Sequence, residues 1–122
     1  MLSNLKSQMR KGLLEYCILS IISRDEAYAS DILDILKTSQ LLVVEGTLYP
    51  LLTRMINEGL LSYRWQESTG GPPRKYYSLT AQGREFLQEL ENAYTEIENA
   101  VNYVKNNPMK ESSLNNEKII AK

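Results

Sequence analysis

The sequence has a single cysteine and no histidine, and these two shortages exclude most kinds of site chemistry. A Cys/His zinc site, a Ser-His-Asp triad and a Cys-His pair each require residues that the chain lacks. The phosphate-loop pattern is also absent, because the Gly- and Lys-containing segment 70–75 leads into a predicted strand and not into a helix. We therefore expect neither an enzyme nor a protein that holds a metal or another cofactor.

The one cysteine, Cys17, lies in a mostly apolar run from Leu13 to Ile22, where a small buried hydrophobe is more typical than a redox thiol. The run follows three basic residues and precedes Ala27-Tyr28-Ala29, so this part of the chain resembles a secretory signal. Glu15 interrupts the run, which is also too short to span a bilayer. We expect a cytoplasmic protein without a membrane partner.

Charge of neither sign dominates the chain. Its net charge is −1, from 14 Lys and Arg against 15 Asp and Glu, which is not the balance of a bulk electrostatic DNA binder. Nine basic residues stand against eight acidic ones up to Gly83, and five against seven from Arg84 onward. Positive charge is therefore available only locally, and binding to a polyanion would depend on a few placed contacts. At 122 residues the core is modest, and an obligate partner could supplement it.

Apolar residues at helical spacing predict three helices in the first half of the chain. The first two span about residues 5–23 and 29–37, and residues 41–44 are a candidate short strand. The third spans residues 47–57, with Gly46 as its N-cap. Its expected core side carries Leu48, Leu51, Leu52, Met55 and Ile56.

The opposite side of the third helix is polar, and its only carboxylate is that of Glu58 at the edge. Thr, Asn and Arg side chains hydrogen-bond base edges and phosphates, and the major groove of DNA admits a helix. Pro50, one turn inside the helix, predicts a slight kink that frees backbone N–H groups of the first turn for a phosphate. A solvated amphipathic helix has the same pattern, so this helix alone leaves both interpretations open.

Two alternating segments, 61–66 and 74–79, predict a β-hairpin. Gly70-Gly71 can adopt positive φ angles and Pro72-Pro73 donates nothing to a ladder, so we expect an exposed, loop-like tip. The charged residues around the tip are Arg64, Glu67, Arg74 and Lys75. Such a cluster is often only solvated, but beside a carboxylate-poor helix it favours phosphate contact. The order of these elements is that of a winged helix that reads DNA.

A long last helix is predicted from Thr80, its N-cap, to about Asn106, ahead of Pro108. Its heptad seam consists of Leu87, Leu90, Tyr94, Ile97, Val101 and Val104. A helix of this length is about 40 Å long, more than a small winged domain covers. We therefore expect dimerisation through the seam, although packing on its own domain would use the same stripe. The first helix is expected to contribute Leu5, Met9 and Leu13 to the dimer interface.

Several segments together resemble the PadR family of bacterial transcriptional regulators. The strongest are Gly46-Thr47-Leu48-Tyr49-Pro50-Leu51-Leu52, Glu58-Gly59-Leu60-Leu61 and Gly71-Pro72-Pro73-Arg74-Lys75-Tyr76-Tyr77-Ser78-Leu79-Thr80. Gly12-Leu13-Leu14-Glu15 and Tyr28-Ala29-Ser30-Asp31-Ile32 resemble the first two helices of the family. The resemblance covers roughly residues 5–105.

The resemblance implies a mainly α (α+β) fold, a winged helix-turn-helix with a two-stranded wing and a long C-terminal dimerisation helix. The expected parts are a DNA-binding domain at 1–80, a dimerisation helix at 81–107 and a disordered tail at 108–122. The implied function is a transcriptional repressor that binds a roughly palindromic double-stranded operator as a homodimer. In some members a hydrophobic or phenolic small molecule between the subunits relieves repression.

Residues of this chain can be assigned to each expected contact. The candidates for reading base edges are Thr47, Thr53, Arg54 and Asn57. The candidates for phosphate contacts are Tyr28, Tyr49, Arg74 and Lys75, with the Gly70-Gly71 tip reaching over the DNA backbone, and Pro50 is a further candidate for DNA binding. The candidates for binding an effector are Met9, Tyr16 and Tyr94. Two alternatives stay open: a winged helix used as a protein-interaction module without specific DNA binding, and a drug-binding dimer whose role on DNA is secondary.

Overall fold

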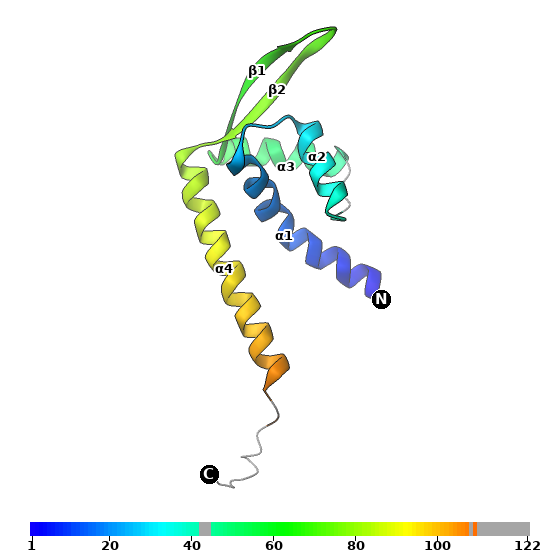
Figure 1. Cartoon of the computed structure of the whole chain (residues 1–122), viewed down its shortest axis with the longest axis vertical. Coiled ribbons are helices and arrows are strands. Elements are labelled where there is room, and N and C mark those ends of the chain that lie inside the picture. Colours follow the sequence, from blue (N-terminus) through cyan, green and yellow to red (C-terminus); the bar gives the residue numbers. More distant parts are fainter. Residues whose placement is uncertain (42–44, 108, 110–122) are drawn as a thin grey trace. The chain divides into compact units, whose positions relative to one another are not determined.

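The computed structural model of the chain describes residues 1–41, 45–107 and 109. The described residues form four α-helices and one two-stranded antiparallel sheet (Figure 1). In chain order the elements are α1 (Leu2–Arg24), α2 (Ala29–Thr38), α3 (Glu45–Asn57), β1 (Leu61–Ser68), β2 (Gly71–Leu79) and α4 (Ala81–Asn106). This is the predicted fold class, with the β1–β2 hairpin as the wing and a long C-terminal helix.

The chain divides into two compact units, residues 1–90 and 91–122. The division falls within α4, so Ala81–Leu90 belong with the helices and the wing that precede them. The functional boundaries after residues 80 and 107, which separate the DNA-binding domain, the dimerisation helix and the tail, stay a prediction. The expected strand at 41–44 and the expected tail at 108–122 lie outside the described residues, except for Leu41 and Met109, which have no regular secondary structure.

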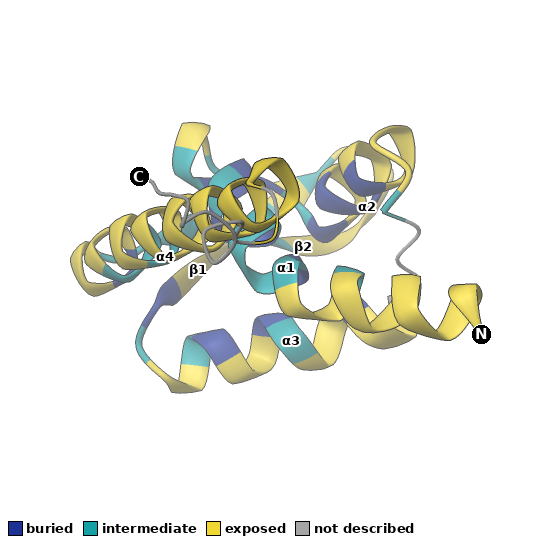
Figure 2. Ribbon diagram, turned by 90° about the horizontal axis from the view of Figure 1, so that it is seen from below, coloured by how far each residue is buried: buried dark blue, intermediate teal, exposed yellow. Residues whose placement is uncertain are grey.

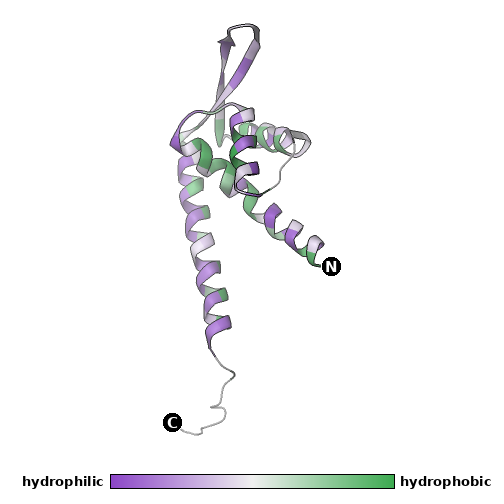
Figure 3. Ribbon diagram, turned by 45° about the vertical axis from the view of Figure 1, so that its right-hand side comes forward, coloured by the Kyte–Doolittle hydropathy of each residue, from purple (hydrophilic) through white to green (hydrophobic). Residues whose placement is uncertain are grey.

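The core of the first unit forms where α1, α2 and α3 turn their apolar sides toward one another (Figures 2 and 3). The largest fully buried side chains are Ile18, Leu19, Ile22, Ile32, Leu36, Leu48, Leu52 and Met55. Three of them lie on the side of α3 that the periodicity assigns to the core. Cys17 is half-buried against this cluster, and burial raises the pKa of its thiol.

Helix α3 begins at Glu45, so Gly46 lies within its first turn and is not the predicted N-cap. Pro50 lies inside the helix, as the sequence requires, and cannot donate the hydrogen bond that a residue there would give to the carbonyl of Gly46. The expected kink stays a prediction.

The wing is longer than the sequence predicts. The strands pair Tyr63 with Tyr77 and continue to Ser68 opposite Gly71, with an irregularity after Gln66. Of the two glycines at the tip, only Gly70 has a positive φ, of 84°, whereas Gly71 is already the first residue of β2. The turn is therefore shorter than the predicted Gly70-Gly71 loop, but the register pairs no β1 residue with Pro72 or Pro73 and the tip is exposed, as predicted. Both strands of a two-stranded sheet are edges, where proline is tolerated because its missing N–H leaves no partner unpaired.

The start of α4 is fixed by Thr80, as predicted. Its hydroxyl accepts a hydrogen bond from the backbone N–H of Gly83 at 2.9 Å and donates one to the carbonyl of Gly59 at 2.7 Å. Gly83 is buried, and a Cβ built on it would lie 2.1 Å from the carbonyl oxygen of Leu60. The first turn of α4 thus lies directly on the chain that joins α3 to the wing.

Candidate nucleic-acid interface

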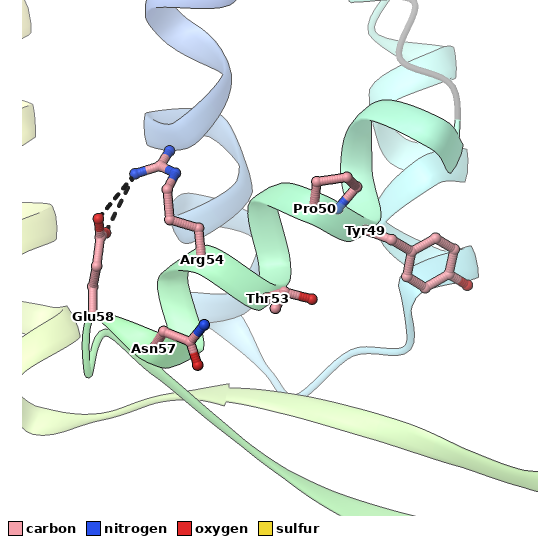
Figure 4. Close-up of a pocket in the computed structure, with 6 residues that line it drawn as sticks. All are labelled: Tyr49, Pro50, Thr53, Arg54, Asn57 and Glu58. Atoms are coloured by element: carbon pink, nitrogen blue, oxygen red, sulfur yellow. Dashed lines mark hydrogen bonds and ion pairs between the residues drawn. The ribbon is translucent and has the colours of Figure 1, made fainter.

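Helix α3 exposes the polar face that the periodicity predicts. All six candidate DNA-binding residues of this helix are exposed: Thr47, Tyr49, Pro50, Thr53, Arg54 and Asn57. All but Thr47 line, together with Glu58, an open depression of about 590 Å³ (Figure 4). The depression therefore follows most of the length of α3.

Arg54 is not free on this face. Its Nη2 lies 3.0 Å from a carboxylate oxygen of Glu15 in α1, and its Nη1 lies 3.2 and 3.3 Å from the two carboxylate oxygens of Glu58. Figure 4 shows the guanidinium turned toward Glu58, while the polar ends of Thr53 and Asn57 point away from it. The hydrogen bond to Glu15, followed by its charge and the bond to Glu58, raises the pKa of Arg54 above its ordinary value.

Sequence reasoning missed Glu15 as a partner of Arg54, because the two lie 39 residues apart. The available signal was a carboxylate inside the apolar run that became α1. A carboxylate among apolar side chains needs a partner or access to water, and Glu15 has the guanidinium of Arg54 as its partner.

A stack of aromatic rings joins the wing to the N-terminus of α2. Tyr28 and Tyr76 stack with their ring centroids 4.5 Å apart and their planes 23° from parallel. The guanidinium carbon of Arg74 lies 3.8 Å from the centroid of Tyr28, and that of Arg64 lies 4.8 Å from the centroid of Tyr76. Cations over ring faces are held electrostatically, so the stack fixes where both arginines lie.

The three wing cations have different partners. Arg64 forms an ion pair of 3.0 Å with Glu26, whose hydrogen bond raises the pKa of that arginine. Arg74 donates a hydrogen bond to the hydroxyl of Ser30 at 3.3 Å. Within the described ranges, neither Arg74 nor Lys75 forms an ion pair with a carboxylate. The sequence analysis grouped Arg64 with Arg74 and Lys75 as cations for phosphate contact. It missed Glu26 as the ion-pair partner of Arg64.

A hollow of about 350 Å³ lies between α2, α3 and the wing. Its lining residues are Tyr28, Ala29, Ser30, Tyr49, Thr53, Trp65, Pro73, Arg74, Lys75 and Tyr77. Five of the predicted DNA-binding residues therefore meet around one space. Tyr49 and Thr53 also line the depression on α3, so the helix face and the cations of β2 form one continuous surface. Gly70 and Gly71 are exposed at the end of the wing and line neither space.

The residues predicted for dimerisation fall into two groups. Leu13, Leu87 and Leu90 are half-buried, and the last two pack against the core of their own unit. Leu5 and Met9 of α1 are 53% and 64% exposed. Ile97, Val101 and Val104 of α4 are 64%, 51% and 74% exposed. The part of the seam near Thr80 is thus used within the chain, and the later part presents apolar side chains to solvent.

The predicted effector residues are accessible to different degrees. Met9 is 64% exposed and Tyr16 is half-buried in the first unit. Tyr94 is 38% exposed in the second unit. An effector site at these residues stays a prediction.

Residues 1–41, 45–107 and 109 include neither a membrane-spanning helix nor a metal-binding cluster. None of the helices there combines the length and hydropathy needed to cross a bilayer. No group of three or more Cys, Asp or Glu side chains in that part of the chain is placed to hold a metal ion.

Comparison with known protein families identifies the chain. The profile of the transcriptional regulator PadR-like family matches residues 18–89, from α1 into α4. The chain is a PadR-like regulator. The match spans α2, α3, the whole wing and the start of α4, and it therefore includes the complete surface described above. Members of this family are transcriptional regulators and not enzymes.

Solved structures of PadR-like regulators resemble this one. A PadR-like transcription factor from Bacteroides fragilis is 60% identical, with a TM-score of 0.71 over 83% of this chain and 98% of the other. A PadR-like transcriptional regulator from Bacillus cereus is 39% identical, with a TM-score of 0.73 over 83% of this chain and 99% of the other. Bacillus subtilis PadR in complex with operator DNA is 26% identical, with a TM-score of 0.58 over 64% of this chain and 46% of that one.

Proposed function

We propose that this PadR-like regulator binds double-stranded operator DNA as a homodimer and represses transcription in the cytoplasm. The observation that carries the proposal is the continuous surface formed by the outer face of α3 and the β2 cations. The operator complex of Bacillus subtilis PadR supports the choice of DNA as the ligand. A protein-interaction module without specific DNA binding is the alternative, and the near-neutral net charge keeps it open.

Base edges are read from α3. Thr47, Thr53 and Asn57 expose short polar side chains that can donate to and accept from base edges in the major groove. Arg54 becomes available for a base when it leaves Glu15 and Glu58. The exposed pyrrolidine of Pro50 and the phenol of Tyr49 flank these residues, and both contact the sugar-phosphate backbone at the edge of the groove.

Phosphates are held between α2 and the wing. Arg74 is positioned by its stack on Tyr28 and its hydrogen bond to Ser30, and Lys75 lies beside it in β2. Both cations line the hollow next to α3 and lack a carboxylate partner in the described part of the chain. The tip at Gly70 and Gly71 has no side chains to prevent close approach of the DNA backbone.

The dimer places two copies of α3 on one face of the duplex. The exposed apolar side chains of α1 and of the second half of α4 supply the surface that a partner subunit would cover. A two-fold dimer of this type reads half-sites about 34–36 Å apart, one turn of B-DNA. The same subunit interface is where Met9, Tyr16 and Tyr94 would hold a hydrophobic or phenolic effector.

A titration by gel shift tests the proposal. The labelled probe is duplex DNA from the region upstream of the gene that encodes this protein. The control is the same duplex with its sequence shuffled. We expect operator binding at least about a thousandfold tighter than binding to the shuffled duplex at the same salt concentration. A footprint should then show two protected half-sites related by symmetry, and transcription from that template should fall. Weak binding that does not depend on sequence would instead support the protein-interaction module.

A further inference from the structure

Trp65 is the only tryptophan of the chain, and it lies on the wing with 61% of its surface exposed. It stands opposite Lys75 in the sheet register, on the same face as Tyr63, which is 42% exposed. Neighbouring aromatic side chains left so open are costly in water unless another molecule covers them. Trp65 belongs neither to the buried core of the described residues nor to the side chains that pack against it.

The ring lies where a bound duplex would pass. Trp65 lines the same hollow as Tyr49 and Thr53 of α3 and Arg74 of β2. A duplex with one groove on α3 and its backbone against the β2 cations must cross the space between them. The surface of Trp65 that faces this hollow would then be covered by the sugar-phosphate strand.

The wing also holds the ring in a defined orientation. Tyr63 and Trp65 meet edge to face, with centroids 6.1 Å apart and planes at 88°. The ammonium of Lys75 lies 4.5 Å from the centroid of Tyr63 and 5.6 Å from that of Trp65. A cation is therefore fixed beside an apolar ring face. A nucleotide presents the matching pair, an apolar deoxyribose next to a charged phosphate.

We infer that Trp65 packs against a deoxyribose of the operator while Lys75 takes the adjoining phosphate. This inference rests on the proposed function and adds a residue that reads no base. Trp65 contributes affinity for any duplex, because every nucleotide carries the same sugar. Its contribution differs in kind from that of Lys75, since an apolar contact releases no counterions from DNA.

Intrinsic fluorescence tests the contact without any substitution. Because the chain has one tryptophan, all tryptophan emission reports on this ring. In the free protein, acrylamide should quench the emission efficiently, and saturating operator should reduce the quenching constant by about threefold or more. Unchanged quenching at saturating operator would overturn the inference. Low quenching before DNA is added would also overturn it, because another part of the dimer would then cover the ring.

Trp65→Ala separates the two kinds of contact. We expect it to weaken binding to operator and to shuffled duplex equally, by about tenfold, from the apolar area that stays in water. Its dependence on salt should match that of the wild type, whereas Lys75→Ala should make the slope shallower by about one unit. Trp65→Phe should recover much of the loss. Tyr103→Ala is the matched control, since it removes a 68% exposed aromatic ring outside the hollow and should bind like the wild type.

The two proposals fail in different ways. Loss of operator preference in the wild-type protein would reject the proposed function. A wild-type protein that recognises its operator while Trp65→Ala binds both duplexes unchanged would reject only the contact. A change in the salt slope for Trp65→Ala would also reject it, because the residue would then act through the charge of its neighbours.

Discussion

Arg54 of α3 lies 3.0 Å from Glu15 of α1, and this ion pair ties the middle of the proposed recognition helix to the N-terminal helix. The same guanidinium also reaches Glu58, one turn further along α3. Both of its terminal nitrogens are thus engaged by carboxylates in the DNA-free protein. A base edge that binds Arg54 must compete with them.

We predict that Glu15→Gln tightens operator binding. If Arg54 binds DNA, the wild-type protein must first break its ion pair with Glu15, and removal of that carboxylate lowers this cost while Glu58 still competes. Exposed pairs of this type contribute up to about 1 kcal/mol, so the dissociation constant should fall by about two- to fivefold. Gel-shift titration measures the change. Glu98→Gln, which removes one charge from α4 outside this cluster, should have a smaller effect.

The effect must depend on Arg54. In an Arg54→Ala background, Glu15→Gln should change operator affinity no more than Glu98→Gln does. Arg54→Ala alone should alter sequence preference at one position of each half-site. If Glu15→Gln tightens binding equally with and without Arg54, the carboxylate acts through general repulsion of DNA and the competition is absent.

The wing cations give a second prediction. Lys75→Ala should weaken binding to all sequences alike and make the slope of log K against log salt shallower by about one unit. Arg64→Ala should leave that slope nearly unchanged, because Glu26 already neutralises this arginine. Titrations at several salt concentrations measure both slopes. Equal changes in the two variants would show that Arg64 leaves Glu26 when DNA binds.

The sequence predicts what local periodicity controls. The buried side of α3 follows from residues such as Leu48 and Met55 at helical spacing, and the N-cap of α4 follows from Thr80. These features depend on residues within about two helical turns of each other. The family resemblance also rests on short local segments, and the winged-helix fold that it implied is confirmed.

Long-range pairings could not be predicted in this way. Glu15 reaches Arg54 across 39 residues, and Glu26 reaches Arg64 across 38. Side-chain partners at such separations depend on how helices pack, and no spacing rule encodes them. The length of the wing was missed for another reason: proline argues against a central strand, but in a two-stranded sheet both strands are edges. The environment of Trp65 could not be predicted either. The alternation of β1 indicates on which face of the wing the ring lies, but not how exposed that face is.

Gly83 gives a prediction about stability. Alanine normally favours a helix over glycine, but here its Cβ would lie 2.1 Å from the carbonyl oxygen of Leu60. The backbone must shift, so Gly83→Ala should lower the free energy of unfolding by about 2 kcal/mol or more. Gly12→Ala is the control, because nothing lies within 4 Å of its Cβ. Chemical denaturation at a fixed protein concentration should show that Gly12→Ala leaves the free energy of unfolding unchanged or raises it slightly.

Cys17 should react slowly with iodoacetamide in the folded protein. Burial raises the pKa of its thiol, so at neutral pH the folded protein has a smaller fraction of the reactive thiolate than an exposed cysteine. Alkylation should speed up as pH rises and should become fast in denaturant. Mass spectrometry over time measures both rates. Equal rates in native buffer and in denaturant would show that the thiol is open to solvent.

The exposed part of the α4 seam gives a test of the proposed dimer. Ile97→Glu places a charge on a side chain that is 64% exposed, so a monomer should tolerate it, whereas a packed subunit interface would have to bury the charge. We expect the dimer to dissociate in sedimentation equilibrium, while the thermal unfolding of the winged domain changes little. Operator affinity should fall by about a hundredfold or more, because one half-site then binds without the other.

Tyr103→Glu is the matched control for this experiment. It introduces the same charge at a residue that is 68% exposed but lies off the seam, about 120° around α4 from Ile97 and about 160° from Val101 at helical spacing. A dimer that packs through the seam should survive this change. If both variants stay dimeric, α4 does not form the interface, and the exposed residues of α1 must be tested next. If both become monomeric, the interface covers more of α4 than one stripe and is not a heptad seam.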